Sequence, residues 1–144
     1  MAINDFPLQA LDKIRYTDTD RQGHVNNSVF ASFLETGRVE CLYNHDIPII
    51  RQGANFVIAS LKLEFMNEIH WPGDVVIGTG VFRVGNSSIT LYQELYQDDR
   101  IVGKAETVIV QVSEATKKSM ELTEGAKDYF RKMLLNKEDY SLRQ

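Results

Sequence analysis

The densest group of chemically active side chains lies in eleven consecutive residues, TDTDRQGHVNN (17–27). The segment holds two carboxylates, one guanidinium, one imidazole and three amides, and an amphipathic pattern follows it directly. The first N–H groups of a helix have no intrahelical acceptor, and the helix dipole places partial positive charge beside them. A carbonyl oxygen bound there is polarised, and an oxyanion that develops on it is stabilised.

Two carboxylates, Asp18 and Asp20, stand a few residues before the expected helix. A carboxylate beside a bound carbonyl carbon acts as a nucleophile or as a general base. Gly23 allows a tight turn or the close approach of a ligand. These parts suffice for a thioester, because thiols have a pKa of about 8.5 and leave as thiolate with little help. The residues therefore permit thioester hydrolysis without selecting it.

The elements that must position this segment are a strand before it and a helix after it. We predict a short strand at Lys13–Thr17. We also predict a helix that begins at Asn26 or Asn27 and ends near Tyr43, since asparagine is a strong N-cap. One helix face carries the apolar stripe Phe30, Phe33, Leu34, Gly37 and Cys41. A glycine within that stripe indicates close packing of another backbone.

Four longer strands and a second helix are expected in the rest of the chain. In the first strand, alternation places Val57, Ala59, Leu61, Leu63 and Phe65 on one face. The other three strands are expected at 75–84, 89–97 and 101–112, with a bulge near Gly103. The second helix is expected to start near Thr123. Short turns predict an antiparallel sheet that wraps around the early helix, and its open edges favour an oligomer.

The segment YTDTDRQGHVNNSVFASFLETGR (16–38) resembles the signature of hotdog-fold acyl-CoA thioesterases of the 4-hydroxybenzoyl-CoA thioesterase-like family. The stretch 58–95 is also similar, with a Pro-Gly-Asp turn and a Gly-x-Ser-Ser turn, and the resemblance covers about residues 13–118. It implies one α+β domain over 1–144. A long central helix would be wrapped by a mainly antiparallel sheet of about five strands, plus a C-terminal helix.

The resemblance also implies an activity, the hydrolysis of an acyl-CoA to free acid and CoA. Asp20 matches the catalytic nucleophile or general base, the backbone N–H of Asn27 matches the oxyanion donor, and His24 has a supporting role. No cofactor is expected beyond the CoA of the substrate. Three alternatives remain open: an acyl-carrier-protein thioesterase, an enoyl-thioester hydratase, and an acyl-CoA-binding module without turnover.

Further residues are expected to contact the substrate, some of them across a subunit boundary. Family members form homodimers or homotetramers in which two sheets join, and their Gly-x-Ser-Ser turn often lies near the pantetheine. The substrate-binding residues that we predict are Gly23, Asn26, Phe30, Ser60, Leu61, Arg83, Asn86, Ser87 and Ser88.

Simpler roles compete for several of these residues. Asp18 is expected to bond loop amides, and His24 is interpreted either as an imidazole that holds the turn or as a substrate contact. Glu35 and Arg38 are three apart on the helix, which favours a surface ion pair over a catalytic glutamate. Cys41 is interpreted as a small core residue.

Composition excludes several classes of protein. The formal net charge of −4 argues against nucleic acid as a partner. A single cysteine forbids an intramolecular disulfide, and no signal peptide or stretch of 18 apolar residues is present. We therefore expect a soluble cytoplasmic protein with no membrane partner. No metal site is expected, because the three histidines, His24, His45 and His70, are widely separated in sequence.

Overall fold

The computed structural model describes residues 3–43 and 49–141. Within them the chain forms one long helix, five strands and several short helices. In chain order these are η1 (Ile3–Asp5), β1 (Leu8–Lys13), η2 (Tyr16–Asp18), α1 (Asn27–Tyr43), β2 (Ala54–Phe65), β3 (Asp74–Val84), β4 (Ser88–Gln97), β5 (Arg100–Ser113), α2 (Glu124–Arg131) and α3 (Glu138–Ser141).

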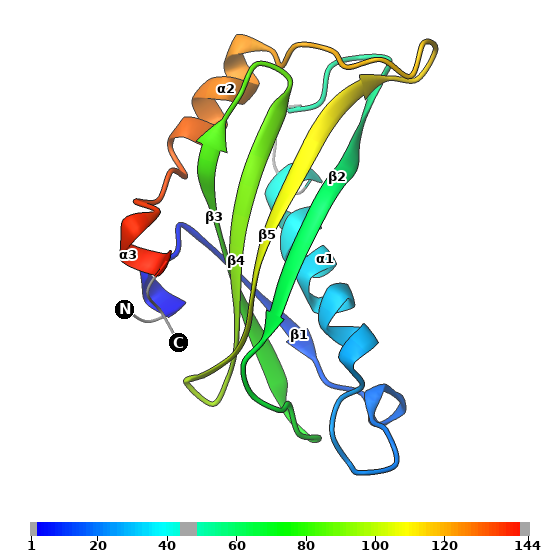
Figure 1. The fold of residues 1–144 in the computed structure, drawn as a ribbon, viewed down its shortest axis with the longest axis vertical. Coiled ribbons are helices and arrows are strands. Elements are labelled where there is room, and N and C mark those ends of the chain that lie inside the picture. The colour runs from blue at the N-terminus through cyan, green and yellow to red at the C-terminus, as the bar shows by residue number, and fades with distance from the viewer. Residues whose placement is uncertain (1–2, 44–48, 142–144) are drawn as a thin grey trace.

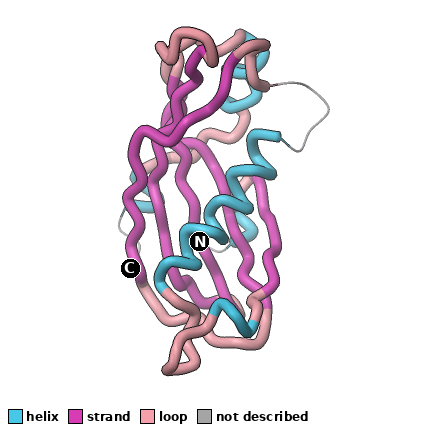
Figure 2. Tube along the Cα trace, turned by 90° about the vertical axis from the view of Figure 1, so that its right-hand side faces the viewer, coloured by secondary structure: helices cyan, strands magenta, loops and turns pink. Residues whose placement is uncertain are grey.

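The five strands form one antiparallel sheet in the order β1-β3-β4-β5-β2. The sheet curves around α1, which crosses one of its faces (Figures 1 and 2). β1 and β2 are the two edge strands, at opposite sides of the sheet. Along the chain, β1 comes directly before α1 and β2 comes directly after it. This is the predicted architecture, a long helix wrapped by a five-stranded antiparallel sheet.

α1 begins where its capping residue predicts. Asn26 Oδ1 accepts hydrogen bonds from the N–H of Ser28 at 3.0 Å and from its hydroxyl at 3.1 Å, which satisfies one free donor of the first turn. The apolar stripe is buried as expected, and Gly37 lies against the sheet. A Cβ at Gly37 would stand 2.6 Å from Ile77 Cγ2 and 2.5 Å from Gln93 Nε2, so this crossing requires glycine.

The first strand differs from its sequence prediction, whereas the C-terminal helix starts where it is predicted. The first strand is Leu8–Lys13 rather than Lys13–Thr17, because the backbone turns into a 3-10 helix at Tyr16–Asp18. The C-terminal helix starts after Thr123, whose hydroxyl accepts from Ala126 N, but it ends at Arg131. Leu134 lies beyond that end and is exposed.

The face predicted for β2 is also wrong. A bulge between Ile58 and Ser60 inserts one extra residue, so Ile58 lies opposite Ile109 and Leu61 lies opposite Thr107. Ile58 and Leu61 therefore share a face, and the alternation from Val57 through Ala59 is broken. The bulge expected near Gly103 is confirmed. Leu95 pairs with Gly103 and the next residue, Tyr96, pairs with Ile101, so β5 has one extra residue at this point.

β2 is the exposed edge of the sheet. Four of its apolar side chains are at least 40% exposed: Val57, Ile58, Leu61 and Phe65. A long apolar edge strand of this kind presents unpaired backbone groups together with hydrophobic surface.

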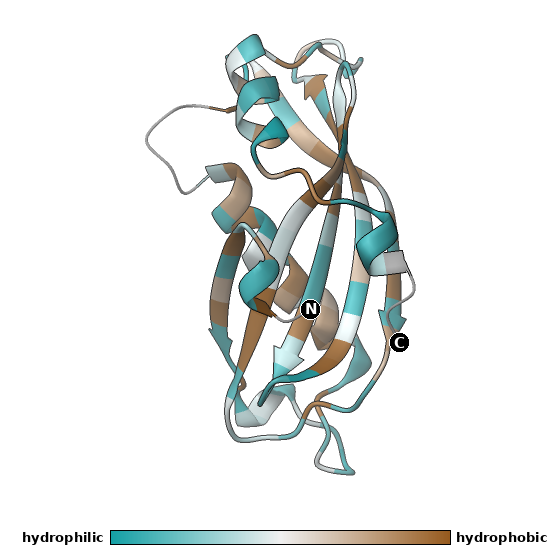
Figure 3. Ribbon diagram, turned by 90° about the vertical axis from the view of Figure 1, so that its left-hand side faces the viewer, coloured by the Kyte–Doolittle hydropathy of each residue, from teal (hydrophilic) through white to brown (hydrophobic). Residues whose placement is uncertain are grey.

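The core lies mainly between α1 and the sheet, where Phe33 and Leu34 pack near Ile77 and Leu95. The strands alternate between hydrophobic and hydrophilic residues along their length (Figure 3). Part of the opposite sheet face is covered by an aromatic cluster that includes Tyr92 and Tyr140. None of the helices in residues 3–43 and 49–141 combines the length and apolar composition needed to cross a bilayer.

Candidate functional site

The polar loop before α1 is closed by a tight turn between Asp20 and His24. The N–H of Asp20 donates to His24 O at 2.8 Å, and the N–H of Gly23 donates to Asp20 O at 3.1 Å. Gly23 has φ +84°, a left-handed conformation that favours glycine. The turn thus holds the Asp20 side chain at a defined place beside the start of α1.

The Asp20 carboxylate is oriented through one of its oxygens. Oδ1 accepts from the N–H of Gln22 at 2.9 Å and from the N–H of His24 at 3.3 Å. Within the described part of the chain, no hydrogen bond reaches Oδ2, and the residue is exposed. One carboxylate oxygen is therefore anchored, and the other is available to a reacting carbon or to water.

Asp20 shares a hollow of about 440 Å³ with the N-terminus of α1. Asn27 is the first residue of the helix, and its N–H forms no hydrogen bond among residues 3–43 and 49–141. Three of the predicted catalytic and capping residues, Asp20, His24 and Asn26, line the same hollow as Asn27, and Phe30 lies in its wall. The hollow therefore combines a carboxylate with a free helix N-terminus, the chemistry that the sequence predicts.

Asp18 has the structural role expected of it. It is buried, and its carboxylate accepts from the N–H of Arg15 at 2.8 Å and from Arg15 Nη2 at 3.3 Å. Its carbonyl accepts from the N–H of Asn26 at 2.8 Å, which ties the loop to the helix cap.

His24 is half-buried and pairs with two residues that the sequence reasoning missed. Its Nε2 lies 3.2 Å from Glu68 Oε2, which also lies 3.6 Å from His70 Nε2. The rings of His24 and His70 meet edge to face with centroids 4.8 Å apart. His24 and His70 are far apart in sequence but close in space, because the segment after β2 folds back beside the loop. His45 lies outside the described residues. No local signal near residue 24 points to residues 68–70.

Other predicted substrate residues are not near Asp20 within one chain. Ser60 and Leu61 lie in the middle of β2. Arg83 and the turn Asn86–Ser88 stand at the opposite end of the sheet from the loop, beside α2 (Figure 1). Asn86 has structural contacts there: its carbonyl accepts from Leu122 N at 2.9 Å, and its Oδ1 lies 3.5 Å from Lys127 Nζ.

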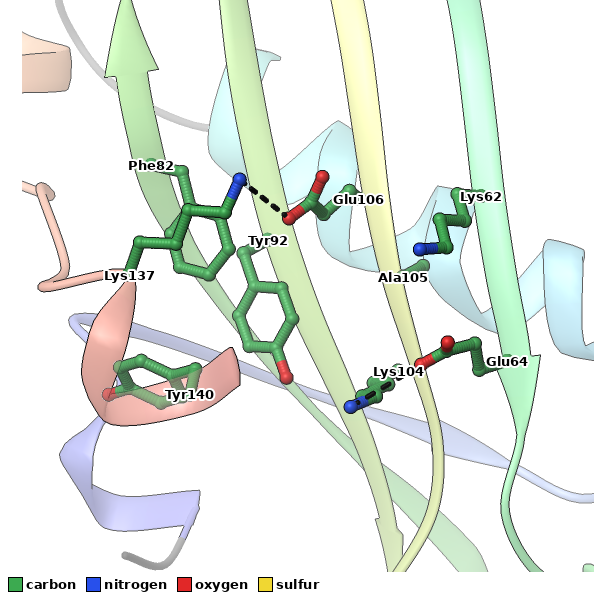
Figure 4. A pocket seen from close by; sticks show the side chains of 9 residues that line it. All are labelled: Lys62, Glu64, Phe82, Tyr92, Lys104, Ala105, Glu106, Lys137 and Tyr140. Carbon is green, nitrogen blue, oxygen red and sulfur yellow. Dashed lines mark ion pairs between the residues drawn. The ribbon is translucent and has the colours of Figure 1, made fainter. Parts of the chain in front are cut away.

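A second hollow, of about 270 Å³, lies on the outer face of the sheet (Figure 4). Four of its charged groups form two ion pairs, Lys104 with Glu64 at 3.3 Å and Lys137 with Glu106 at 3.6 Å, and Lys62 also lines it. None of the residues predicted from the sequence lines it. The hollow beside Asp20 is therefore the better candidate for the reactive site.

Two residues of α1 belong to the interior. Arg38 is buried rather than on the surface, and no close ion pair with Glu35 forms among the described residues. Burial lowers the pKa of the Arg38 guanidinium, and the Glu35 carboxylate, which raises this pKa, offsets only part of that effect. Cys41 is fully buried, as expected of a core residue, and burial raises the pKa of its thiol to about 12.

Comparisons with known proteins agree with the fold. The chain is similar to a predicted thioesterase from Bacillus stearothermophilus, with 22% identity, a TM-score of 0.77, and 89% of this chain and 96% of that chain covered. It is also similar to a thioesterase from Thermus thermophilus complexed with coenzyme A and Zn, with 24% identity, a TM-score of 0.76, and 88% and 98% covered. A DHNA-CoA thioesterase from Staphylococcus aureus matches with 18% identity, a TM-score of 0.71, and 78% of each chain. These likenesses confirm the hotdog fold.

No curated protein sequence matches the chain. The model of the thioesterase superfamily matches residues 22–104, which is more than half of the chain and includes His24, Asn27 and Glu68. The chain belongs to the thioesterase superfamily, and thioester hydrolysis is the general reaction that this membership supports.

Proposed function

We propose that the chain hydrolyses an acyl-CoA thioester to the free acid and CoA, with Asp20 as its central carboxylate. The observation that carries this proposal is the single hollow lined by Asp20 and by Asn27, whose N–H has no other acceptor in the described chain. The T. thermophilus relative that holds coenzyme A supports CoA as the thiol part of the substrate.

The reaction places the thioester carbonyl oxygen at the Asn27 N–H, where the dipole of α1 stabilises negative charge. Asp20 Oδ2 then attacks the carbonyl carbon, CoA leaves as thiolate, and water cleaves the resulting anhydride to give the acid and restore the carboxylate. In the other route Asp20 accepts a proton from water while that water adds to the carbonyl. Hydroxylamine trapping of an anhydride distinguishes the two routes.

The role of His24 is to shape this hollow rather than to attack the substrate. Its backbone N–H and carbonyl both bond Asp20, and its ring faces Glu68. His24→Ala keeps both backbone bonds to Asp20 and removes the ring contacts with Glu68 and His70. We therefore expect it to lower thermal stability and to affect kcat less than a change at Asp20.

The same proposal includes a homodimer in which β2 pairs with β2 of a second copy. Two-fold antiparallel pairing would continue the sheet, cover the apolar edge side chains and place Ser60 and Leu61 near the symmetry axis. Ser87 O accepts from Gln111 N at 2.9 Å, and Gln111 lies opposite Phe56 near the start of β2. Antiparallel pairing would bring the end of the sheet that holds Ser87 in one copy toward the end that holds Asp20 in the other. The turn Asn86–Ser88 would then reach the hollow across the interface.

The first experiment measures thiol release from short, long and aromatic acyl-CoAs by the wild type and by Asp20→Asn. We expect kcat/KM of the best substrate to fall by about 10²–10⁴-fold in the variant. Asp99→Asn is the matched control, because Asp99 is an exposed turn residue with φ 62°, which asparagine tolerates.

Three outcomes contradict the proposal. Wild-type kcat/KM in Asp20→Asn removes Asp20 from the mechanism. Loss of enoyl absorbance from crotonyl-CoA without thiol release indicates a hydratase instead. Tight acyl-CoA binding with turnover at the uncatalysed rate indicates a binding module.

A further inference from the structure

We propose that His24, Glu68 and His70 form a binding site for a zinc-like divalent metal ion at the rim of the hollow beside Asp20. The three side chains offer two imidazole nitrogens and one carboxylate oxygen, and these ligand atoms all lie within 4.8 Å of one another. Two imidazoles and one carboxylate are ligands that zinc and similar first-row ions accept.

The backbone holds the three residues in register. His24 and His70 are direct partners in an antiparallel β-bridge, so their side chains point to the same side. Glu68 is two residues before His70, and its carboxylate lies on that side as well, 3.2 Å from His24 Nε2 and 3.6 Å from His70 Nε2. The juxtaposition thus follows from strand pairing and not from a chance meeting of surface side chains.

Neighbouring hydrogen bonds fix this pairing. The N–H of Val25 donates to Ile69 O at 2.8 Å. Gln97 clamps His70 from both sides: its Oε1 accepts from His70 N at 3.0 Å, and its Nε2 donates to His70 O at 2.6 Å. Ile69, between the two ligand positions, is fully buried. The ligand backbones are therefore anchored before any ion arrives.

The separations match a tetrahedral ion. Ligands about 2.0–2.1 Å from zinc lie about 3.3 Å from one another in that geometry. Glu68 Oε2 is 3.2 Å from His24 Nε2 and 3.6 Å from His70 Nε2. The two imidazole nitrogens are the remaining pair, and they lie within 4.8 Å of each other.

The ion would lie between two hollows and keep an open coordination position. Glu68 lines both the hollow beside Asp20 and a smaller one of about 200 Å³ that His70 also lines. With three protein ligands, the fourth position remains for water, as in zinc sites that stay open. Because His24 and Glu68 also line the reactive hollow, an ion there constrains its wall and adds positive charge near Asp20.

The test is titration of the metal-free protein with ZnCl₂ by calorimetry, together with the visible absorption spectrum of bound Co²⁺. We expect one ion per chain in the wild type and a Co²⁺ spectrum of low symmetry with nitrogen and oxygen ligands. His70→Ala and Glu68→Gln change exposed side chains and each should weaken Zn²⁺ binding by at least about 10–100-fold, because they remove a direct ligand.

His45→Ala is the matched control, since it removes the remaining histidine of the chain and should leave binding unchanged. Thermal melting checks that each variant folds. The proposal is overturned if the wild type binds no Zn²⁺ at 100 times the protein concentration, or if His70→Ala and Glu68→Gln bind it as tightly as the wild type does. These readouts require no turnover, so they remain informative if the proposed hydrolysis fails.

Discussion

Asp20 and His24 hold each other through their backbones and one side chain: Asp20 N donates to His24 O at 2.8 Å, and His24 N lies 3.3 Å from Asp20 Oδ1. The proposed catalytic carboxylate and one proposed metal ligand therefore belong to one rigid turn. A change in the shape of this turn must displace both groups.

Gly23 is the position at which that turn is most sensitive. Its φ of +84° strains any L side chain, although a Cβ there would meet no atom within 4 Å. We expect Gly23→Val to lower the free energy of unfolding by about 1–3 kcal/mol and to reduce kcat/KM, because Asp20 moves. Gly23→Asn should lose less stability and less kcat/KM than Gly23→Val, since asparagine enters the left-handed region more easily than valine does. Urea unfolding and thiol release measure the two effects, and equal losses in the two variants would contradict the strain argument.

Gly37 tests the packing of α1 on the sheet. Alanine has the higher helix propensity by about 1 kcal/mol, but its Cβ would overlap Gln93, Ile77 and Thr79. We expect the overlap to win, so that Gly37→Ala is less stable than the wild type by about 1–3 kcal/mol in urea unfolding. Gly125→Ala in α2 is the control, because its nearest neighbour would be 4.0 Å away. An increase in stability at Gly37 would refute the close approach.

Cys41 should be chemically inert in the folded protein. It is fully buried, and its thiol pKa of about 12 leaves almost no thiolate near neutral pH. We expect no reaction with a thiol reagent such as 5,5′-dithiobis(2-nitrobenzoate) at pH 8 over minutes, and stoichiometric reaction in guanidinium chloride. Rapid labelling of the native protein would mean that α1 opens readily at this turn.

The pair of Glu121 and Lys127 predicts a pH-dependent contribution to stability. Lys127 Nζ donates to Glu121 Oε1 at 2.9 Å, and this hydrogen bond holds the pKa of Glu121 below its usual value. A lowered pKa in the folded state stabilises the protein above the unfolded pKa, and the contribution is lost as pH falls through the folded pKa. The stability difference between the wild type and Glu121→Gln should therefore be present at pH 7 and shrink below about pH 4. A difference that stays constant across this range in urea unfolding would exclude the linkage.

The proposed dimer predicts that charge at the β2 edge separates the subunits. Ile58→Lys and Leu61→Lys place ammonium groups on the exposed apolar side chains of this strand. We expect sedimentation to show a monomer, with thiol release at least about 10-fold lower because the partner's turn no longer helps to position the substrate. Leu134→Lys is the control, since Leu134 is equally exposed but lies after α2. A monomeric wild type with full activity would contradict the dimer.

Much of the fold was predictable because its signals are local. Asn26 caps α1, the apolar stripe of that helix is buried, and the turns between the later strands follow their sequences. The alternation in β2 predicts the wrong face, because a bulge at Ile58–Ser60 shifts the register and no glycine or proline marks it in the sequence. Likewise, nothing near Leu8 identifies the edge strand that pairs with β3.

The chemistry before α1 follows from the local sequence: a carboxylate at Asp20, a turn at Gly23 and a helix N-terminus at Asn27. These are neighbours along the chain, so short-range hydrogen bonds decide their arrangement. The positions of His70 and Glu68 beside His24, and of the turn at Asn86 at the opposite end of the sheet, depend instead on how the chain folds. Residues separated by more than forty positions meet through strand pairing, and that pairing depends on the register and packing of the whole sheet rather than on any local pattern.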